Sequence, residues 1–209
     1  MTTSQITPLE LPANLQTVTE FERWQEQYVH EGSQEFVRGL VIDRGGIAQV
    51  HSALHAFLSR RFAQTESYQW GDMLATRLDC YVSDTCLRVP DLSFYDVDQI
   101  LGMGRSEKQS TRFAIEILSN SESYRDVTDK VQDYFDAGAQ LVWYVVPEQQ
   151  KIYVYTSPNE SKAYRVVTLS QPRPCCQIFS LRCLTCLRRY FLPRRLHHRP
   201  QINAHHVGI

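Results

Sequence analysis

Apolar side chains recur every three or four positions in three segments of the chain, a spacing that predicts amphipathic helices. The segments are 17–29, 47–62 and about 122–137. The first begins with Thr17 followed by Glu20, the pattern of a capping box at a helix N-terminus. The last is closed by Gly138, a residue type that often ends helices because it adopts positive φ angles without strain.

Other segments alternate apolar and polar positions or are continuously apolar, and these patterns predict strands. The predicted strands are 34–43, segments at about 68–82 and 88–96, then 112–118, 140–147, 151–157 and 162–169. Residues 98–110 are polar with two glycines, which predicts a loop. The order strand, helix, strand between residues 112 and 147 predicts a parallel βαβ crossover, and the hairpin-like pieces around it predict a mixed sheet. The expected fold class is therefore α/β, a mixed β-sheet flanked by helices.

The composition is that of one water-soluble domain with a substantial core. The chain has 209 residues, of which 43% are apolar and 22% are charged. No apolar run approaches the roughly 18 residues that a membrane span needs, and the first residues lack the basic and apolar regions of a signal peptide. We therefore expect a cytoplasmic protein with no membrane partner, in which the cysteines stay mostly reduced. Cys80 and Cys86 flank a turn and are predicted to be small packed residues.

The charge distribution divides the chain. After Glu160 there are nine Lys or Arg residues and no Asp or Glu, so the preceding part is acidic overall. An acidic body excludes a general electrostatic affinity for nucleic acid and leaves room only for a local basic patch. We divide the chain into an N-terminal arm (1–16), one domain (17–169) and an atypical basic tail (170–209).

The tail has three interpretations. It holds four of the six cysteines and four of the seven histidines, but their spacing does not fit a zinc finger. Its positive charges would suit a basic arm that follows phosphates. The interpretation that we favour is a sequence translated out of frame after about Ser170, because acids and periodicity vanish together there, and disorder would be the consequence.

Glu116 interrupts an otherwise apolar strand, where an ionised carboxylate is costly unless something pairs with it. Strand alternation puts it on one face with Ala114 and Leu118. Asp91 follows Pro90 at the start of another predicted strand, so the two carboxylates converge if these strands are neighbours. Converging carboxylates repel each other, which raises a pKa or requires a cation. Oxygen ligands without nearby Cys or His favour Mg²⁺ or Mn²⁺.

Lys130 is the third candidate. On a helical projection Val131 and Tyr134 fall on the buried arc, Asp133 falls on the opposite face, and Lys130 lies at the edge of the arc. Its amine can then reach the carboxylates while its stem packs, or else it simply extends to solvent or forms a salt bridge with Asp126 or near Tyr134. A metal, two carboxylates and an ammonium together suit phosphodiester hydrolysis, because the metal polarises the phosphate and activates a water.

These candidates have structural alternatives. Glu116 could instead be a buried carboxylate paired with an arginine such as Arg88 or Arg112. His51 and His55 have the i, i+4 spacing that can bind a metal, but two solvated histidines are the simpler expectation.

The segments "VPD", "AIEILS" and "RDVTDKVQDYFDAGAQLVWYVVPE" resemble a restriction endonuclease family of the Uma type, within the PD-(D/E)xK nuclease superfamily. The resemblance covers about 17–169 and implies a restriction-endonuclease-like fold and a Mg²⁺-dependent (or Mn²⁺-dependent) endodeoxyribonuclease that acts on DNA. By position it implies Asp91 and Glu116 as metal ligands and Lys130 as the catalytic lysine. Glu35 corresponds to an early acidic residue, a further metal ligand or a residue that holds water.

Three departures from the family pattern stand out. The superfamily places its lysine two residues after the glutamate, where this chain has Leu118. The resemblance to the Uma type implies that this lysine lies on the helix instead, which agrees with Lys130. Val146 replaces the family's aspartate before Pro147, and the family's apolar final strand is missing.

The favoured hypothesis is therefore a DNA endonuclease, with a homodimer as a plausible arrangement because cutting both strands of a duplex needs two sites. The alternative is a catalytically inactive relative that acts only as a nucleic-acid or protein binding module. A zinc-dependent binding module built on the tail is the third class.

Overall fold

The computed structural model describes residues 14–27, 32–45, 49–118 and 122–165. The predictions for the tail at 170–209 and for most of the arm at 1–16 lie outside these residues. In the part of the chain described, no helix combines the length and apolar character that crossing a bilayer requires.

The described residues form helices and two β-sheets. The helices are α1 (Val18–Gln27), α2 (Gln49–Phe62), α3 (Glu66–Gln69), α4 (Val97–Gly104) and α5 (Tyr124–Asp136). The strands are β1 (Gln34–Val37), β2 (Leu40–Asp43), β3 (Met73–Thr76), β4 (Cys80–Ser83), β5 (Cys86–Arg88), β6 (Leu92–Tyr95), β7 (Phe113–Ile117), β8 (Leu141–Val146), β9 (Lys151–Ser157) and β10 (Glu160–Arg165).

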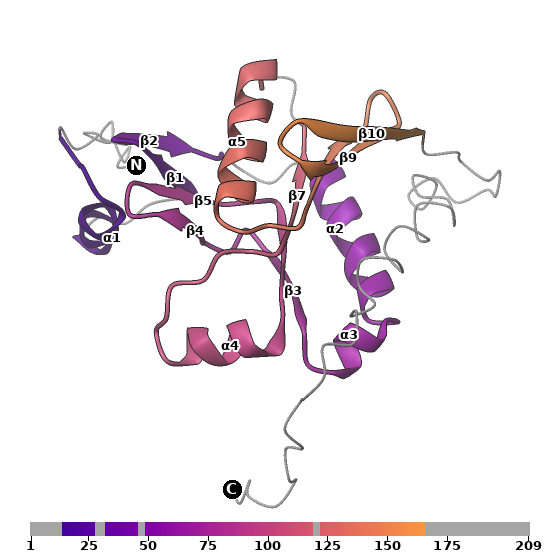
Figure 1. The fold of residues 1–209 in the computed structure, drawn as a ribbon, viewed down its shortest axis with the longest axis horizontal. Helices are drawn as coiled ribbons and strands as arrows, with labels where there is room; N and C mark the ends of the chain where they lie inside the picture. The colour runs from indigo at the N-terminus through magenta and orange to yellow at the C-terminus, as the bar shows by residue number, and fades with distance from the viewer. Residues whose placement is uncertain (1–13, 28–31, 46–48, 119–121, 166–209) are drawn as a thin grey trace, which may run out of the picture.

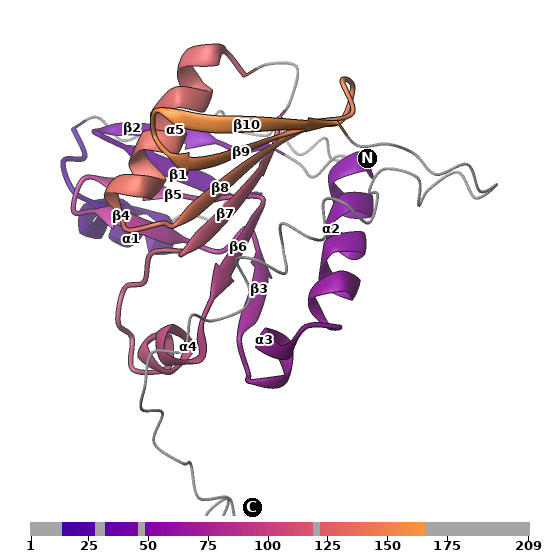
Figure 2. The same ribbon diagram turned by 45° about the vertical axis from the view of Figure 1, so that its right-hand side comes forward.

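The larger sheet has the strand order β10-β9-β8-β7-β6-β3. Strands β7 and β8 are parallel and joined through α5, while the other neighbouring pairs are antiparallel. The predicted βαβ crossover and the predicted mixed sheet are both confirmed. Helix α2 lies along one face of this sheet and α5 along the other (Figures 1 and 2).

Alternate residues of β7 contribute side chains to opposite faces of the larger sheet. Ile115 and Ile117 point toward α2 and form one apolar cluster with Leu54, Leu58 and Trp143. Burial of such side chains stabilises the fold by roughly 1.5–3 kcal/mol each.

On the opposite face, Ala114 packs with Val131, Tyr134 and Tyr144 in a second cluster. Because Glu116 shares the strand face of Ala114, it enters this cluster beneath α5. The sequence therefore places a carboxylate at the end of an apolar interface.

The smaller sheet has the order β2-β1-β5-β4 and is covered by α1. Phe21 and Trp24 of α1 pack with Phe36 and Leu87 of the sheet. The capping box predicted at the start of α1 is confirmed, because Thr17 and Glu20 exchange hydrogen bonds of 3.2 Å.

The single strand predicted at 34–43 is wrong, because it is a hairpin of β1 and β2. Arg38 and Gly39 have φ angles of 49° and 89° and form the tight turn, the conformation that two-residue hairpin loops favour. The hairpin returns the chain so that Arg44, just after β2, lies next to the start of β1 and donates its backbone N–H to Ser33 O at 2.9 Å. This reversal matters for the site described below.

Two other local predictions need correction. The loop predicted at 98–110 contains α4, whose N-terminus is fixed by a capping box between Asp96 and Gln99. The strand-like segment at about 68–82 is divided into the end of α3, then β3 and β4. Cys80 and Cys86 are free and buried, as predicted.

Candidate active site

The two predicted carboxylates lie side by side because β6 and β7 are antiparallel neighbours. Leu92 pairs with Ile115, so Asp91, one residue before β6, lies across from the end of β7. Asp91 Oδ2 accepts a hydrogen bond of 2.8 Å from the backbone N–H of Ile117. Asp91 and Glu116 are 5% and 1% exposed. The predicted neighbouring of the two strands is confirmed.

The buried carboxylate of Glu116 is compensated by three side chains. Its Oε1 accepts a hydrogen bond of 2.6 Å from the Tyr134 hydroxyl, and its Oε2 accepts one of 2.9 Å from Arg44 Nη2. Lys130 Nζ lies 3.8 Å from Oε1. Together these contacts offset the free-energy cost of burying a carboxylate in an apolar cluster.

The expected pairing of a buried Glu116 with an arginine is confirmed, but the partner is neither Arg88 nor Arg112. Arg88 instead binds Glu35 and Asp133, and Arg112 binds Asp96. The arginine that pairs with Glu116 is Arg44, one residue after the segment predicted as a strand.

The guanidinium of Arg44 is the centre of the cluster. Besides Glu116, it lies near Asp91 Oδ1 (Nη2, 3.7 Å), Glu35 Oε1 (Nε, 3.4 Å) and Glu122 Oε1 (Nη1, 3.7 Å). Its side chain is 13% exposed. Burial alone would lower the pKa of Arg44, but the surrounding carboxylates outweigh burial and raise it, so Arg44 stays charged.

Lys130 reaches the same cluster from α5. Lys130 Nζ donates a hydrogen bond of 2.7 Å to Glu122 Oε1, and the residue is 4% exposed. Burial lowers its pKa, but the negative charges of Glu116, Glu35 and Glu122 more than offset this and raise the pKa overall. The placement at the edge of the buried arc is confirmed, and the alternative of an amine extended to solvent is wrong.

Glu35, the weakest candidate, adjoins the cluster from β1. It is fully buried, with Oε2 accepting from Arg88 Nη1 at 2.9 Å and Oε1 accepting from the Val89 N–H at 3.2 Å. Both oxygens therefore have partners, in addition to the contact with Arg44. Its assignment as a metal ligand or a holder of water stays a prediction.

Asp133 was predicted on the exposed face of α5, and this is wrong. It is 1% exposed and accepts hydrogen bonds from Arg88 Nη2 at 2.6 Å and Nε at 2.9 Å, and from Arg38. The physical reason is the second sheet, because α5 contacts β4 as well as β8. A helix between two sheets has two buried sides, and a projection that assumes one sheet misses the second.

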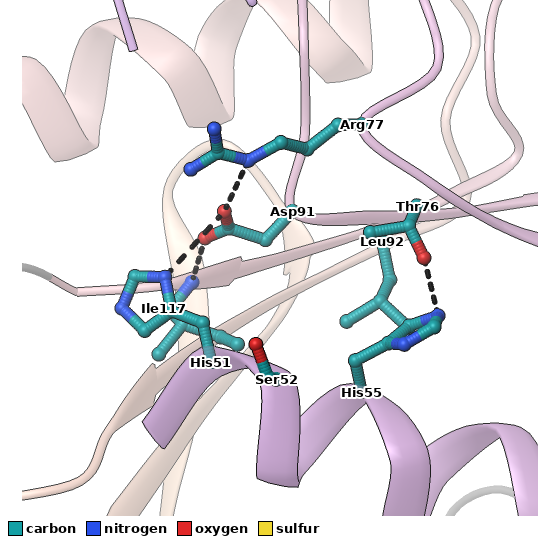
Figure 3. A pocket seen from close by; sticks show the side chains of 8 residues that line it. All are labelled: His51, Ser52, His55, Thr76, Arg77, Asp91, Leu92 and Ile117. Atoms are coloured by element: carbon teal, nitrogen blue, oxygen red, sulfur yellow. Dashed lines mark hydrogen bonds and ion pairs between the residues drawn. The ribbon is translucent and has the colours of Figure 1, made fainter. Parts of the chain in front are cut away.

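The Asp91 side chain also lines a small cavity of about 70 Å³ (Figure 3). Its walls are formed by His51, Ser52, His55, Thr76, Arg77, Asp91, Leu92 and Ile117. His51 Nδ1 and Arg77 Nε each lie 3.8 Å from Asp91 Oδ1. His55 Nε2 hydrogen-bonds Thr76 Oγ1 at an exposed position, and both histidines are partly buried. The expectation of two solvated histidines stays a prediction.

Arg77 is held beside this cavity by the backbone. Its φ angle is 46°, in the left-handed region, its N–H donates to Asp91 O, and its Nη1 donates to Gly45 O at 2.7 Å. A non-glycine residue in this conformation is often over-determined by its surroundings at functional sites.

The electrostatic environment of Asp91 matches the repulsion expected from two converging acids. Burial raises the pKa of Asp91, and the negative charge of Glu116 raises it further. The Ile117 N–H, Arg44 and His51 act in the opposite direction but do not cancel the rise. An added cation would relieve this repulsion.

The donor set fits a hard divalent cation in its chemistry, since Asp91 and Glu116 offer carboxylate oxygens. Among the described residues, however, no three His, Cys, Asp or Glu side chains are gathered into a ready metal site. Arg44 Nη2 lies within contact distance of both carboxylates. The role of these residues as metal ligands stays a prediction.

Several members of the cluster were not predicted as site residues. Tyr134 was assigned only to the buried arc of its helix, and Arg44, Glu122 and Arg77 lie outside the helices and strands, where a single sequence gives no periodic signal.

Comparison with known proteins agrees with this architecture. The family model Uma2, described as a putative restriction endonuclease, matches residues 18–180. Among solved structures, a putative nuclease belonging to DUF820 from Anabaena variabilis has a TM-score of 0.61 and 23% sequence identity, and the match covers 77% of this chain and 90% of that one. This likeness confirms the predicted fold class. No curated protein matches the chain.

Proposed function

Because the chain belongs to the Uma2 family of putative restriction endonucleases, we propose that it is a metal-dependent DNA endonuclease whose active site contains Asp91, Glu116 and Lys130. The observation that carries the proposal is the convergence of these three side chains, from the start of β6, from β7 and from α5, onto one buried cluster. Buried charged groups that perturb one another's pKa values are concentrated at functional sites.

The metal ligands in this proposal are Asp91 and Glu116, with Mg²⁺ or Mn²⁺ as the cation. Glu35 is a further ligand in the proposal if it exchanges one of its present hydrogen-bond partners for the metal ion. When bound, a divalent ion would polarise the phosphodiester and lower the pKa of a coordinated water.

Lys130 acts as a cationic hydrogen-bond donor. Its raised pKa keeps the ammonium protonated, so it suits stabilising negative charge or orienting a water and does not suit accepting a proton. Glu122 holds the amine at 2.7 Å and fixes its direction. Tyr134 fixes Glu116 in the same way through its hydrogen bond of 2.6 Å.

The test is nicking of supercoiled plasmid DNA in the presence of Mg²⁺ or Mn²⁺. We expect cleavage by the wild type, and a loss of about 100-fold or more in Asp91→Asn, Glu116→Gln and Lys130→Met, because each removes a charge used in the chemistry. Lys162→Met removes an exposed lysine of β10 and is the matched control, which should cleave like the wild type. Cleavage that survives Asp91→Asn or Glu116→Gln would refute the assigned site.

A binding module without catalysis is the second candidate. The observation that favours it is that cations already pair with every carboxylate of the cluster, while Leu118 stands at the superfamily's usual lysine position. A folded wild type that shifts DNA in a gel but cleaves none with either metal would establish this alternative. Sedimentation of the same sample would show whether a homodimer supplies two sites to one duplex.

A further inference from the structure

Arg44 brings one positive charge into contact with carboxylates from four separate parts of the chain. Its guanidinium lies 2.9 Å from Glu116, 3.4 Å from Glu35, and 3.7 Å from both Asp91 and Glu122. It joins β1, the residue before β6, strand β7 and the segment two residues before α5. No single pair explains this placement, so Arg44 serves the cluster as a whole.

The contacts with Asp91 and Glu116 are made by one atom of the guanidinium. Nη2 lies near Asp91 Oδ1 and donates a hydrogen bond to Glu116 Oε2. A divalent cation that binds both carboxylates needs oxygens that face the region now occupied by Nη2. The cation is also positively charged, like the guanidinium. The guanidinium and a metal ion cannot both neutralise these oxygens at contact distance, because two cations there would repel each other.

We propose that Arg44 is a resident counterion that competes with the divalent cation for Asp91 and Glu116. It neutralises the cluster in the metal-free protein and withdraws from these two carboxylates when the metal binds. This inference rests on the proposed metal-dependent function and adds to it the way in which the site controls metal affinity.

Withdrawal does not require Arg44 to become unpaired. The contacts with Glu35 and Glu122 are made by the other nitrogens, Nε and Nη1. Because the guanidinium is a rigid plane, its three nitrogens move together, and a shift of the whole group toward Glu35 and Glu122 takes Nη2 away from the two metal-facing carboxylates while acids still surround it. The side chains of Arg44 and Glu122 are each 13% exposed, so both reach the surface of the cluster.

The neighbouring cations are less suited to the same role. Lys130 lies near Glu116 but not near Asp91, and its amine is bound to Glu122. Arg77 lies 3.8 Å from Asp91, and a hydrogen bond to Gly45 O restrains it. Of the described cations, Arg44 is the one in contact with both Asp91 and Glu116.

The test is calorimetric titration of Mn²⁺ into the metal-free full-length protein, without DNA. We expect Arg44→Gln to bind Mn²⁺ about tenfold or more tightly than the wild type, because the competing charge is gone. Arg44→Lys keeps a charge but lacks the extended guanidinium, so a smaller gain of about threefold is expected. The matched control is Arg112→Gln, which removes an arginine that is bound to Asp96 away from the cluster and should change affinity by less than about twofold.

Thermal unfolding supplies a second measurement that does not depend on titration heats. Without metal, Arg44→Gln should unfold at a lower temperature than the wild type, because buried carboxylates lose their counterion. Saturating Mn²⁺ should then raise its Tm by more than it raises the Tm of the wild type. If Arg44→Gln does not fold without metal, Arg44→Lys keeps the inference testable.

The outcomes separate this inference from the proposed function. Unchanged or weaker Mn²⁺ binding by a folded Arg44→Gln protein, or by Arg44→Lys where that is the folded variant, would overturn the competition. If the wild type nevertheless cleaves DNA with Mn²⁺, the proposed function survives that result. If no variant and no wild-type sample binds Mn²⁺, both the competition and the metal-dependent proposal fail.

Discussion

At the scale of single residues, the site shows how a protein keeps acids inside an apolar cluster. Glu116 has two direct hydrogen bonds, from Tyr134 and Arg44, and a nearby ammonium. Asp91 has one strong hydrogen bond, from Ile117 N–H, and its charged neighbours lie farther away. The two carboxylates are therefore stabilised unequally, which gives opposite expectations for their neutral replacements.

In the metal-free protein, we expect Asp91→Asn to raise the free energy of unfolding at neutral pH by about 1 kcal/mol. Burial and Glu116 raise the pKa of Asp91, so its ionisation opposes folding, while the asparagine oxygen can still accept the Ile117 hydrogen bond. Below the ordinary carboxyl pKa, wild type and variant should differ little. As the pH rises through the raised pKa of Asp91, the wild type should lose stability relative to the variant.

Urea unfolding between pH 4 and 8 measures this difference. Glu116→Gln is the contrasting variant and should lose stability, because it gives up the ion pair with Arg44. Asp129→Asn removes an exposed carboxylate of α5 and should change stability by less than about 0.5 kcal/mol. A destabilised Asp91→Asn protein across this pH range would contradict the expectation.

The residues of the site differ in how far the sequence reveals them. Asp91 and Glu116 were predictable because strand alternation and Pro90 fixed their faces and positions. Lys130 was predictable because helical periodicity put it at the edge of a buried arc. Arg44 was not, because it follows β2 of the smaller sheet while Glu116 lies in the larger one, and the β1–β2 hairpin must first reverse the chain to bring them together.

At the scale of elements, α5 connects the two sheets by charge as well as by apolar packing. Asp133 of α5 binds Arg88 of β5, which in turn binds Glu35 of β1. This chain of buried ion pairs ties the helix that carries Lys130 to the small sheet. The geometry of the site therefore depends on contacts outside it.

We expect Arg88→Met to lower the free energy of unfolding by about 3–5 kcal/mol, because Glu35 and Asp133 would each lose a buried counterion. Arg38→Met is the matched control, since Arg38 binds the same Asp133 but is 59% exposed, and it should cost less than about 1 kcal/mol. Denaturant unfolding of both variants checks this. Equal effects of the two substitutions would show that the buried pairs contribute no more than the exposed one.

The β1–β2 hairpin and α4 were predicted wrongly because the apolar pattern does not show where these elements begin or end. Alternation continues through Arg38 and Gly39, so nothing in the apolar pattern marks the hairpin turn that the positive φ angles reveal. Gly102 suggested a loop, yet the capping box that begins at Asp96 was enough to start α4. Long periodic segments such as α2 and α5 were predictable because many positions repeat the same signal.

At the scale of the whole molecule, the described core and the candidate site lie within residues 14–165. The sequence predicted one domain at 17–169, and the family match extends to residue 180. The division into two sheets was not predictable, because a single sequence does not show which strands share a sheet. The tail's out-of-frame origin and the boundary at residue 170 stay predictions.

Two truncated chains test that boundary. We expect a chain that ends at Ser170 to keep the Tm of the full-length protein within about 2–4 °C, a change that corresponds to about 1 kcal/mol for a domain of this size. The reason is that β10, the last strand of the described residues, is exposed along its length. A second chain that ends at residue 180 includes the rest of the family match and is the control. If the shorter chain melts clearly lower than the longer one, residues 171–180 belong to the folded domain and the predicted boundary is wrong.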